Sequence, residues 1–493
     1  MQGIRPSSLY KATYVYLGLP LLIFIIGWLN YGAALVFSLL FLLAFSKLYG
    51  KSDEDNSSYL ISRQFIGIAF LLALLWCFFA GIGYFYYQSW DYHIRNALFR
   101  DLINYKWPIF YDKANTPLVY YMGFWLFPAL IGKISALFSN NPQLIFLLSN
   151  IILLLYAIGG TILIFLHIAV SFGLSDIRRF IFYCVFFIFF SGTDIIGYLF
   201  FMNTEQPFAY HLDWWAGFIQ YSSFTTSMFW VFNQFIPTAL TVFLIFNEHK
   251  IHTFALLLVF ILFLAPYPAI SCAVLMASFA IKQFYLTSEK KLFLFADIFS
   301  IPNIIACFFL FPLIFLYFIT NSGGIDRFSL ITDTIPAYRV FLFLILECLL
   351  YIILICRYFY KNPLFVAMTL FLLIIPWFRF DQQNNFCMRT SISMLIALSY
   401  FCLSYLNDKE IRKRIICYLL LSLWILGSAT GIMEFYRGFH HIGAAHRINL
   451  VSDDIYTLNQ PYVRMPVFGW SANHQFSAQN YRSDIFWNYL AKK

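Results

Sequence analysis

Long apolar segments, separated by short polar connections, recur from one end of this chain to the other. An apolar stretch of about 17–25 residues is long enough to cross a bilayer as a helix. Helices suit that environment because their backbone groups are hydrogen-bonded within the segment. Only 11% of the residues are charged and 61% are hydrophobic, whereas a soluble domain is about a quarter charged. The sequence therefore predicts an all-α, multi-pass membrane protein and excludes an ordinary soluble enzyme.

The apolar segments predict about 13 transmembrane helices. We expect them at residues 12–29, 33–46, 65–84, 143–169, 180–193, 227–246, 253–265, 268–282, 292–319, 340–356, 363–378, 392–406 and 415–433. One further apolar segment, Pro117–Leu137, is expected to lie in the interface or to dip in and return. It begins at a proline and carries Pro128 and Lys133, which favours a broken helix that does not span the membrane.

The connections between these helices fall into two sets. One set is short and basic, at 47–63, 171–179, 247–252, 282–291, 357–362 and 407–414. The other is longer, mixed in charge and rich in Trp and Tyr, at 85–116, 192–226, 321–339, 379–391 and after residue 431. Because Lys and Arg in short loops favour the cytoplasm, we expect the first set inside and the second outside. A crossing by Pro117–Leu137 would break this separation.

This topology predicts four regions along the chain. Residues 1–64 form an N-terminal hairpin and cytoplasmic loop. Residues 65–250 form a module with a first external loop at 85–141 and a second at 192–226. A C-terminal transmembrane bundle (251–433) and an external tail (434–493) follow. No nucleotide-binding glycine motif and no basic stripe is present, so we expect neither ATP-driven transport nor a nucleic acid partner.

Asp91 is the first residue with a candidate role in chemistry. It follows the third predicted helix in Trp90-Asp91-Tyr92-His93 and opens a segment with apolar residues at helical spacing. That spacing predicts an amphipathic helix on the membrane surface. A carboxylate there can take a proton from an attacking alcohol as a general base. It can equally cap the first turn of the helix, and local spacing does not separate the two interpretations.

The next apolar segment begins Thr116-Pro117-Leu118-Val119-Tyr120-Tyr121. This start is similar to the Pro-Pro-Leu-Tyr-Tyr pattern of the GT-C superfamily of membrane glycosyltransferases, with Thr116 in place of the first proline. An early Asp in the first external loop and interfacial helices after it also resemble that superfamily. The resemblance covers residues 65–250 in architecture. Its motifs are short, so they indicate a superfamily and not a substrate.

The resemblance implies an inverting transfer of a sugar from a polyprenyl-phosphate carrier to an acceptor hydroxyl at the external membrane face. The acceptor is then a glycan or a lipid-linked molecule, and membrane lipid surrounds the enzyme. By position, Asp91 is the general base and Asp194 the second acidic residue, with Asp213 as its competitor. We favour Asp194 because it lies nearer the bilayer boundary. We expect the bacterial cytoplasmic membrane as the location.

Other residues are candidates for substrate binding. Arginine suits a phosphate because its planar fork binds two oxygens, which favours Arg389 and Arg379, although an Arg at a helix end is also a common anchor. Gln220, Asn233 and Gln234 can hydrogen-bond sugar hydroxyls or join neighbouring helices. The full substrate-binding set is His93, His211, Asp213, Gln220, Asn233, Gln234, Arg389 and Arg379.

A divalent metal and two other functions remain open at this stage. The pairs Asp91-x-His93 and His211-x-Asp213, with Asp194, allow Mg²⁺ or Mn²⁺ without specifying either. Glu347, inside a predicted helix, is expected to have a structural role. The alternative functions are a polymerase of lipid-pyrophosphate-linked glycan repeat units and a non-enzymatic transporter of lipid or glycan.

Overall fold

The computed structural model describes residues 3–48, 59–89, 91–201, 211–217, 219–286, 291–321, 329–380, 384–442, 455–460, 473–478 and 481–493. Within these ranges the chain is mainly helical and contains almost no sheet, as predicted. The helices are α1 (Pro6–Trp28), α2 (Tyr31–Ser46), α3 (Arg63–Phe79), α4 (Asp91–Asn104), α5 (Gly123–Ser135), α6 (Pro142–Ser171), α7 (Ile177–Ile188), α8 (Asp194–Phe201), α9 (Phe224–Asn247), α10 (Phe254–Leu264), α11 (Pro266–Leu286), α12 (Lys291–Ile298), α13 (Ile301–Ile305), α14 (Phe311–Ile319), α15 (Ala337–Leu344), α16 (Leu350–Phe359), α17 (Pro363–Ile374), α18 (Asn385–Asn407) and α19 (Arg414–Ile442).

Shorter elements complete the description. The strands β1 (Phe110–Tyr111) and β2 (Thr116–Pro117) pair antiparallel, as do β3 (Ser329–Leu330) and β4 (Phe378–Arg379). A 3₁₀ turn, η2 (Leu212–Ala216), follows α8, and a π turn, η6 (Ile345–Leu349), joins α15 to α16.

Eight helical segments of the described chain are long and apolar enough to cross a membrane. They are Pro6–Trp28, Pro142–Ser171, Phe224–Asn247, Pro266–Tyr285, Ile301–Ile319, Ala337–Phe359, Asn385–Asn407 and Arg414–His441. The structure therefore supports a multi-pass membrane protein, whereas the predicted number of 13 spans is not confirmed. The remaining predicted spans coincide with the shorter helices α2, α3, α7, α10 and α17.

The segment predicted not to cross the membrane forms β2 and the short helix α5. A helix rises about 1.5 Å per residue, so the 13 residues of α5 extend about 20 Å, less than the hydrocarbon thickness of about 30 Å. Pro128 lies inside α5, and Lys133 near its end donates hydrogen bonds to the backbone carbonyls of Ile103 and Tyr105. These contacts hold α5 against α4.

Polar residues at the helix starts explain several element boundaries. Asn30 accepts a hydrogen bond from the Ala33 N–H, and Asn141 precedes a proline at the first position of α6. Asp176 accepts from the Arg179 N–H at the start of α7, and the Ser223 hydroxyl accepts from the Thr226 N–H at the start of α9. Each cap pairs an N–H that the first helical turn leaves unsatisfied.

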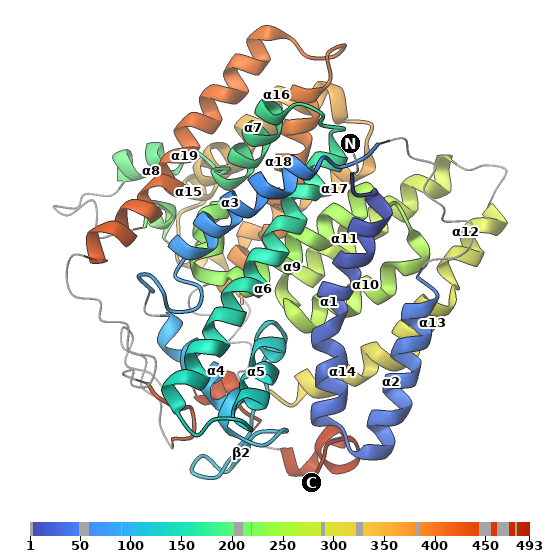
Figure 1. Cartoon of the computed structure of the whole chain (residues 1–493). Helices are drawn as coiled ribbons and strands as arrows, with labels where there is room; N and C mark the ends of the chain where they lie inside the picture. The colour runs from blue at the N-terminus through green and yellow to red at the C-terminus, as the bar shows by residue number, and fades with distance from the viewer. Residues whose placement is uncertain are drawn as a thin grey trace.

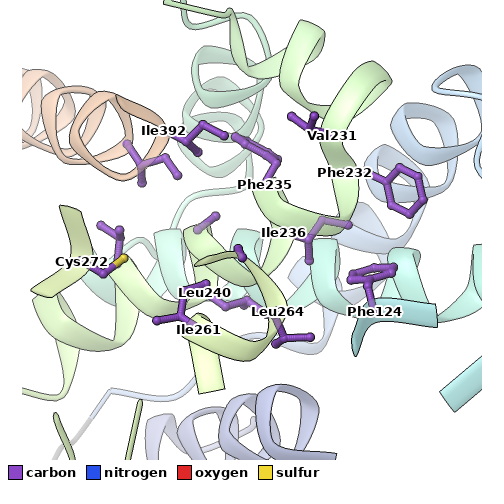
Figure 2. Packing of buried hydrophobic residues seen from close by; sticks show 14 of the residues in the cluster. Phe124, Val231, Phe232, Phe235, Ile236, Leu240, Ile261, Leu264, Cys272 and Ile392 are labelled. Carbon is purple, nitrogen blue, oxygen red and sulfur yellow. The ribbon is translucent and has the colours of Figure 1, made fainter. Parts of the chain in front are cut away.

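Helix α9 lies at the centre of the bundle and is buried along almost its whole length. Helices α6, α10, α11, α18 and α19 pack around it. Figure 2 shows side chains of α9 facing those of α5, α10, α11 and α18; the labelled residues are Phe124, Val231, Phe232, Phe235, Ile236, Leu240, Ile261, Leu264, Cys272 and Ile392.

Helices α4 and α5 lie at one end of the molecule with β2 and the C-terminus, and the N-terminus lies at the opposite end (Figure 1). Described parts of the C-terminal region dock on this α4 end. Asp101 of α4, whose side chain is buried, accepts hydrogen bonds from the Thr457 hydroxyl (2.6 Å) and the Leu458 N–H (2.8 Å). Burial raises the pKa of Asp101 to about 6. The Val119 N–H donates to the Phe476 carbonyl (3.0 Å), so the tail fixes the chain just before Tyr120 and Tyr121.

Candidate functional site

Asp91 is the first residue of α4, within the helix rather than before it. A carboxylate in a first helical turn is favoured by the helix dipole. Its Oδ2 accepts a hydrogen bond from Nη2 of Arg95, one turn later, at 2.7 Å. The Arg95 side chain is only 7% exposed, but the Asp91 side chain is 22% exposed. The carboxylate is therefore oriented by a buried arginine while part of it remains open to a substrate.

Arg95 also connects α4 to a break in the central helix α9. Val231 has non-helical backbone angles (φ −138°, ψ 38°), and the carbonyl of the preceding residue, Trp230, accepts a hydrogen bond from Nη1 of Arg95. Non-helical backbone at membrane depth requires such substitute partners. The kink in α9 therefore brings Trp230 beside the Asp91–Arg95 pair.

A second cluster, formed by His211, Glu434 and Arg437, lies on the other side of Trp230. His211 Nδ1 is 2.6 Å from Glu434 Oε1, and Arg437 Nη1 donates to the same oxygen at 3.2 Å. The Trp230 indole N–H donates to Glu434 Oε2 at 3.4 Å. All three cluster side chains are buried. The sequence predicted a boundary between the C-terminal bundle and the external tail after residue 433. In the structure this position lies inside α19, the helix that carries both Glu434 and Arg437.

Electrostatic interactions place the His211–Glu434–Arg437 cluster near Asp91. Burial lowers the pKa of His211, whereas the negative charges of Glu434 and, more weakly, Asp91 raise it. Asp91 and His211 are therefore near enough for their charges to interact. The first and second predicted external loops thus meet at one site, as the general-base hypothesis requires.

The acidic cluster of Asp194, Asp213 and Glu347 is more deeply enclosed. Asp194 Oδ2 accepts from the hydroxyls of Ser191 (2.9 Å) and Thr430 (2.8 Å). The Trp215 indole N–H donates to Glu347 Oε1 at 3.0 Å. Each of the three carboxyl side chains is about 1% exposed. Asp194 therefore faces hydroxyls inside the protein, and within the described residues it makes no hydrogen bond with Asp91.

Asp213 links the two clusters. Its oxygens accept from the Gln220 amide (3.2 Å) and the Thr226 hydroxyl (3.4 Å). Burial raises the pKa of Asp213 well above its usual value, and the negative charges of Asp194 and Glu434 raise it further. Asp213 and Gln220 thus bind each other and hold η2 against α9, which is a positioning role. Among the described residues, no three His, Cys, Asp or Glu side chains are arranged to hold a metal ion, and a metal requirement stays a prediction.

Gly192 allows the acidic cluster to pack closely. A Cβ atom at residue 192 would lie 2.0 Å from Glu347 Oε2 and 2.6 Å from Glu347 Cα. We expect Gly192→Ala to lower the free energy of unfolding by about 1–3 kcal/mol, since the overlap includes backbone. Gly159→Ala is the matched control, because nothing lies within 4 Å of its Cβ. Thermal unfolding in detergent measures both, and equal stability of the two variants would contradict the close packing.

Arg389 lies in the first turn of α18, where α18 meets the residues after β2. Its Nη1 donates to the Tyr121 hydroxyl at 2.5 Å, and its guanidinium lies 5.9 Å from the Tyr121 ring centroid and 5.7 Å from that of Tyr267. Its Nε is buried and has no hydrogen-bond partner among the described residues. The charges of Arg389 and Asp91 interact, but no carboxylate is paired with Arg389 in the described part of the chain. Arg389 is therefore a cation held between two tyrosines.

Asn233 and Gln234 lie on α9 just after the kink, and both are buried. None of their four side-chain amide atoms has a hydrogen-bond partner among the described residues. They therefore make no hydrogen bond with Asp91 or Arg389 in the described part of the chain.

We expect Asn233→Leu and Gln234→Met to leave the stability of the unliganded protein unchanged or to raise it. A buried amide without a partner lowers the stability of the folded state, and an apolar side chain of similar shape removes that cost. Asn150→Leu on α6 is the comparison, since that buried amide does donate to the Phe146 carbonyl at 2.8 Å. This third variant should lose about 1 kcal/mol. Thermal unfolding of the three purified variants measures the difference. Equal destabilisation of all three would show that Asn233 and Gln234 have partners in the folded protein.

The remaining predicted residues lie on α4 and β4. His93 is half-buried on α4, and Arg379 lies on β4, where it pairs in register with Ser329. Another arginine, Arg339 of α15, donates to the Trp215 carbonyl at 2.5 Å. The sequence reasoning missed Arg95, Tyr121, Trp230, Glu434 and Arg437. The spacing Glu434-x-x-Arg437 was a usable signal for a continuing helix, since residues three apart share one face.

The comparisons with known proteins found no match: no family model, no curated protein and no solved structure is similar to the chain. The functional assignment therefore rests on the residues and contacts described above.

Proposed function

We propose that this protein transfers a sugar from a polyprenyl-phosphate carrier to an acceptor hydroxyl, with inversion at the anomeric carbon. One observation carries the proposal. Asp91 is a partly exposed carboxylate whose charge interacts with that of Arg389, a cation that has no carboxylate partner among the described residues. A base and an unneutralised cation are the two groups that such a transfer needs, because the phosphate is already a good leaving group.

In the proposed reaction, the acceptor oxygen forms a bond to the anomeric carbon while the bond from that carbon to the phosphate oxygen breaks. The proton of the acceptor hydroxyl passes to Asp91, whose orientation Arg95 maintains. The departing polyprenyl phosphate keeps the electron pair of the broken bond. Arg389 and the Tyr121 hydroxyl stabilise its negative charge, since a guanidinium binds phosphate oxygens with a planar fork.

The position of the site suits a donor that is part lipid and part sugar. Helix α5 is too short to span the hydrocarbon. Tyr121 precedes α5, and Arg389 lies near the start of α18 (Asn385–Asn407), a helix that is long enough to span the hydrocarbon. Both groups are therefore expected near the membrane surface, where a lipid-linked phosphate lies. We propose the external face of a bacterial cytoplasmic membrane, in accordance with the basic connections on the other side.

The test uses the full-length chain in proteoliposomes with radiolabelled sugars on polyprenyl monophosphate and, in parallel, lipid-pyrophosphate-linked glycan units, each with a mixture of glycan and lipid-linked acceptors. The proposal expects transfer from the monophosphate donors, with an inverted linkage and release of polyprenyl phosphate. Transfer of whole units from pyrophosphate carriers alone would identify the polymerase instead. Movement of lipid across the bilayer without a covalent product would identify a transporter.

A further inference from the structure

Trp214 is the exposed member of an otherwise buried turn. Its side chain is 38% exposed, whereas Leu212, Asp213, Trp215 and Ala216, the other residues of η2, are buried. A large aromatic ring left open in a well-packed segment presents an apolar face to whatever approaches.

Trp214 continues into an aromatic surface with His211 and Trp230. The His211 ring centroid is 4.7 Å from that of Trp214 and 4.4 Å from that of Trp230, and the two indoles are 6.5 Å apart. Trp230 is half-buried and His211 is buried between the indoles. The two tryptophans therefore flank a polar ring.

Hydrogen-bonding groups surround this surface without giving it a strong net charge. Glu434 and Arg437 compensate each other at 3.2 Å, and the Arg437 guanidinium lies 5.7 Å from the Trp230 ring centroid. Burial, which lowers the pKa of His211, favours the neutral imidazole. A phosphate would need free positive charge here, whereas a neutral ligand with apolar and hydroxyl-bearing faces would not.

The side chain of Arg95 connects this aromatic surface to Asp91, the proposed base. Arg95 donates from Nη2 to Asp91 and from Nη1 to the Trp230 carbonyl. A molecule that rests on Trp214 and Trp230 is therefore beside the carboxylate that takes the acceptor proton. The donor phosphate site at Arg389 involves Tyr121 and Tyr267 instead.

We propose that Trp214 and Trp230 form the acceptor subsite and that the acceptor is a saccharide, whose ring stacks on the indoles while its hydroxyls reach the His211–Glu434–Arg437 cluster. A sugar ring has an apolar C–H face and a hydroxyl edge, which matches an aromatic surface with a few placed polar groups. This inference rests on the proposed function, because it assigns the acceptor of the same reaction.

The test measures saccharide binding apart from catalysis. Full-length Asp91→Asn protein in detergent is titrated with tetrasaccharides of glucose, mannose and galactose, alone and combined with Trp214→Ala or Trp214→Phe. We expect at least one tetrasaccharide to bind, with about tenfold weaker binding for Trp214→Ala and nearly unchanged binding for Trp214→Phe, which keeps a ring. Phe200→Ala on α8, also an exposed aromatic residue, is the matched control and should not change binding.

The two proposals fail in different ways. Transfer from polyprenyl-phosphate sugars without binding of any tetrasaccharide would overturn the saccharide subsite and leave the transferase in place. Binding that depends on Trp214, in a protein that transfers no sugar, would overturn the transferase and leave the subsite. Unchanged saccharide affinity in Trp214→Ala, with lowered thermal stability, would show a tryptophan that anchors the protein at the membrane interface and would overturn the subsite.

Discussion

Asp91→Asn is expected to lower the rate of sugar transfer by about 10²–10⁴-fold, the range that a positioned general base contributes. Asn has nearly the shape of Asp and still offers Arg95 an acceptor oxygen in place of the 2.7 Å ion pair. An amide has no basic oxygen comparable to a carboxylate, however, so the proton of the acceptor has no place to go. Because Asp91 acts on the acceptor, the KM for the lipid-linked donor should change little.

Initial rates with the wild-type chain and the variant, measured over a range of donor concentrations, test this prediction. Asp112→Asn is a suitable control, since Asp112 is an exposed carboxyl in the same predicted loop and lies outside the site. A variant that keeps more than about a tenth of the wild-type rate would show that another group takes the proton. Loss of thermal stability together with activity would assign Asp91 a structural role instead.

The fold could be predicted from the sequence as far as apolar periodicity reaches. Hydropathy located the helices, and Pro128 with Lys133 indicated a short helix after β2, which is the 13-residue α5 of the structure. That this segment does not cross the membrane stays a prediction. The end of α19 could not be found in this way. Glu434 and Arg437 interrupt the apolar run and so read as a polar tail, but they pair with each other and with His211 inside the protein. A hydropathy pattern cannot predict that charged groups are buried when their partners come from distant parts of the chain.

Asp91 shows what local sequence could predict of the site, and Arg389 shows what it could not. The position of Asp91 at the start of an amphipathic helix follows from residue spacing. The contact of Arg389 with Tyr121 joins residues 268 positions apart, and only the folding of α18 against the start of α5 creates it. The burial of Asp194 is likewise a tertiary feature, because one of the two hydroxyls that surround its carboxylate belongs to Thr430, 236 positions away. The predicted location of Asp194 near the membrane surface stays a prediction.

Arg389→Met is expected to weaken the binding of polyprenyl phosphate by about 10–100-fold, which is the loss expected when one charged hydrogen-bond donor to a phosphate is removed. Met matches the aliphatic part of the arginine side chain and lacks the guanidinium that lies near the rings of Tyr121 and Tyr267. Arg389→Lys keeps the charge but not the planar fork, so its affinity for polyprenyl phosphate should lie between those of the wild-type chain and Arg389→Met. Competition of polyprenyl phosphate with a labelled donor measures all three proteins, and Arg178→Ala, an exposed arginine on α7, serves as the control.

The same substitution should have the opposite effect on stability. In the unliganded protein, Arg389 has a buried Nε without a partner and no carboxylate to compensate its charge within the described residues. Such a charge is unfavourable in the folded state, so Arg389→Met should unfold at the same or a higher temperature than the wild-type chain while it binds the phosphate less well. A residue that lowers stability in order to bind a ligand is typical of a functional site. If the variant loses stability and keeps its affinity for polyprenyl phosphate, Arg389 is a structural residue and the leaving group must be bound elsewhere.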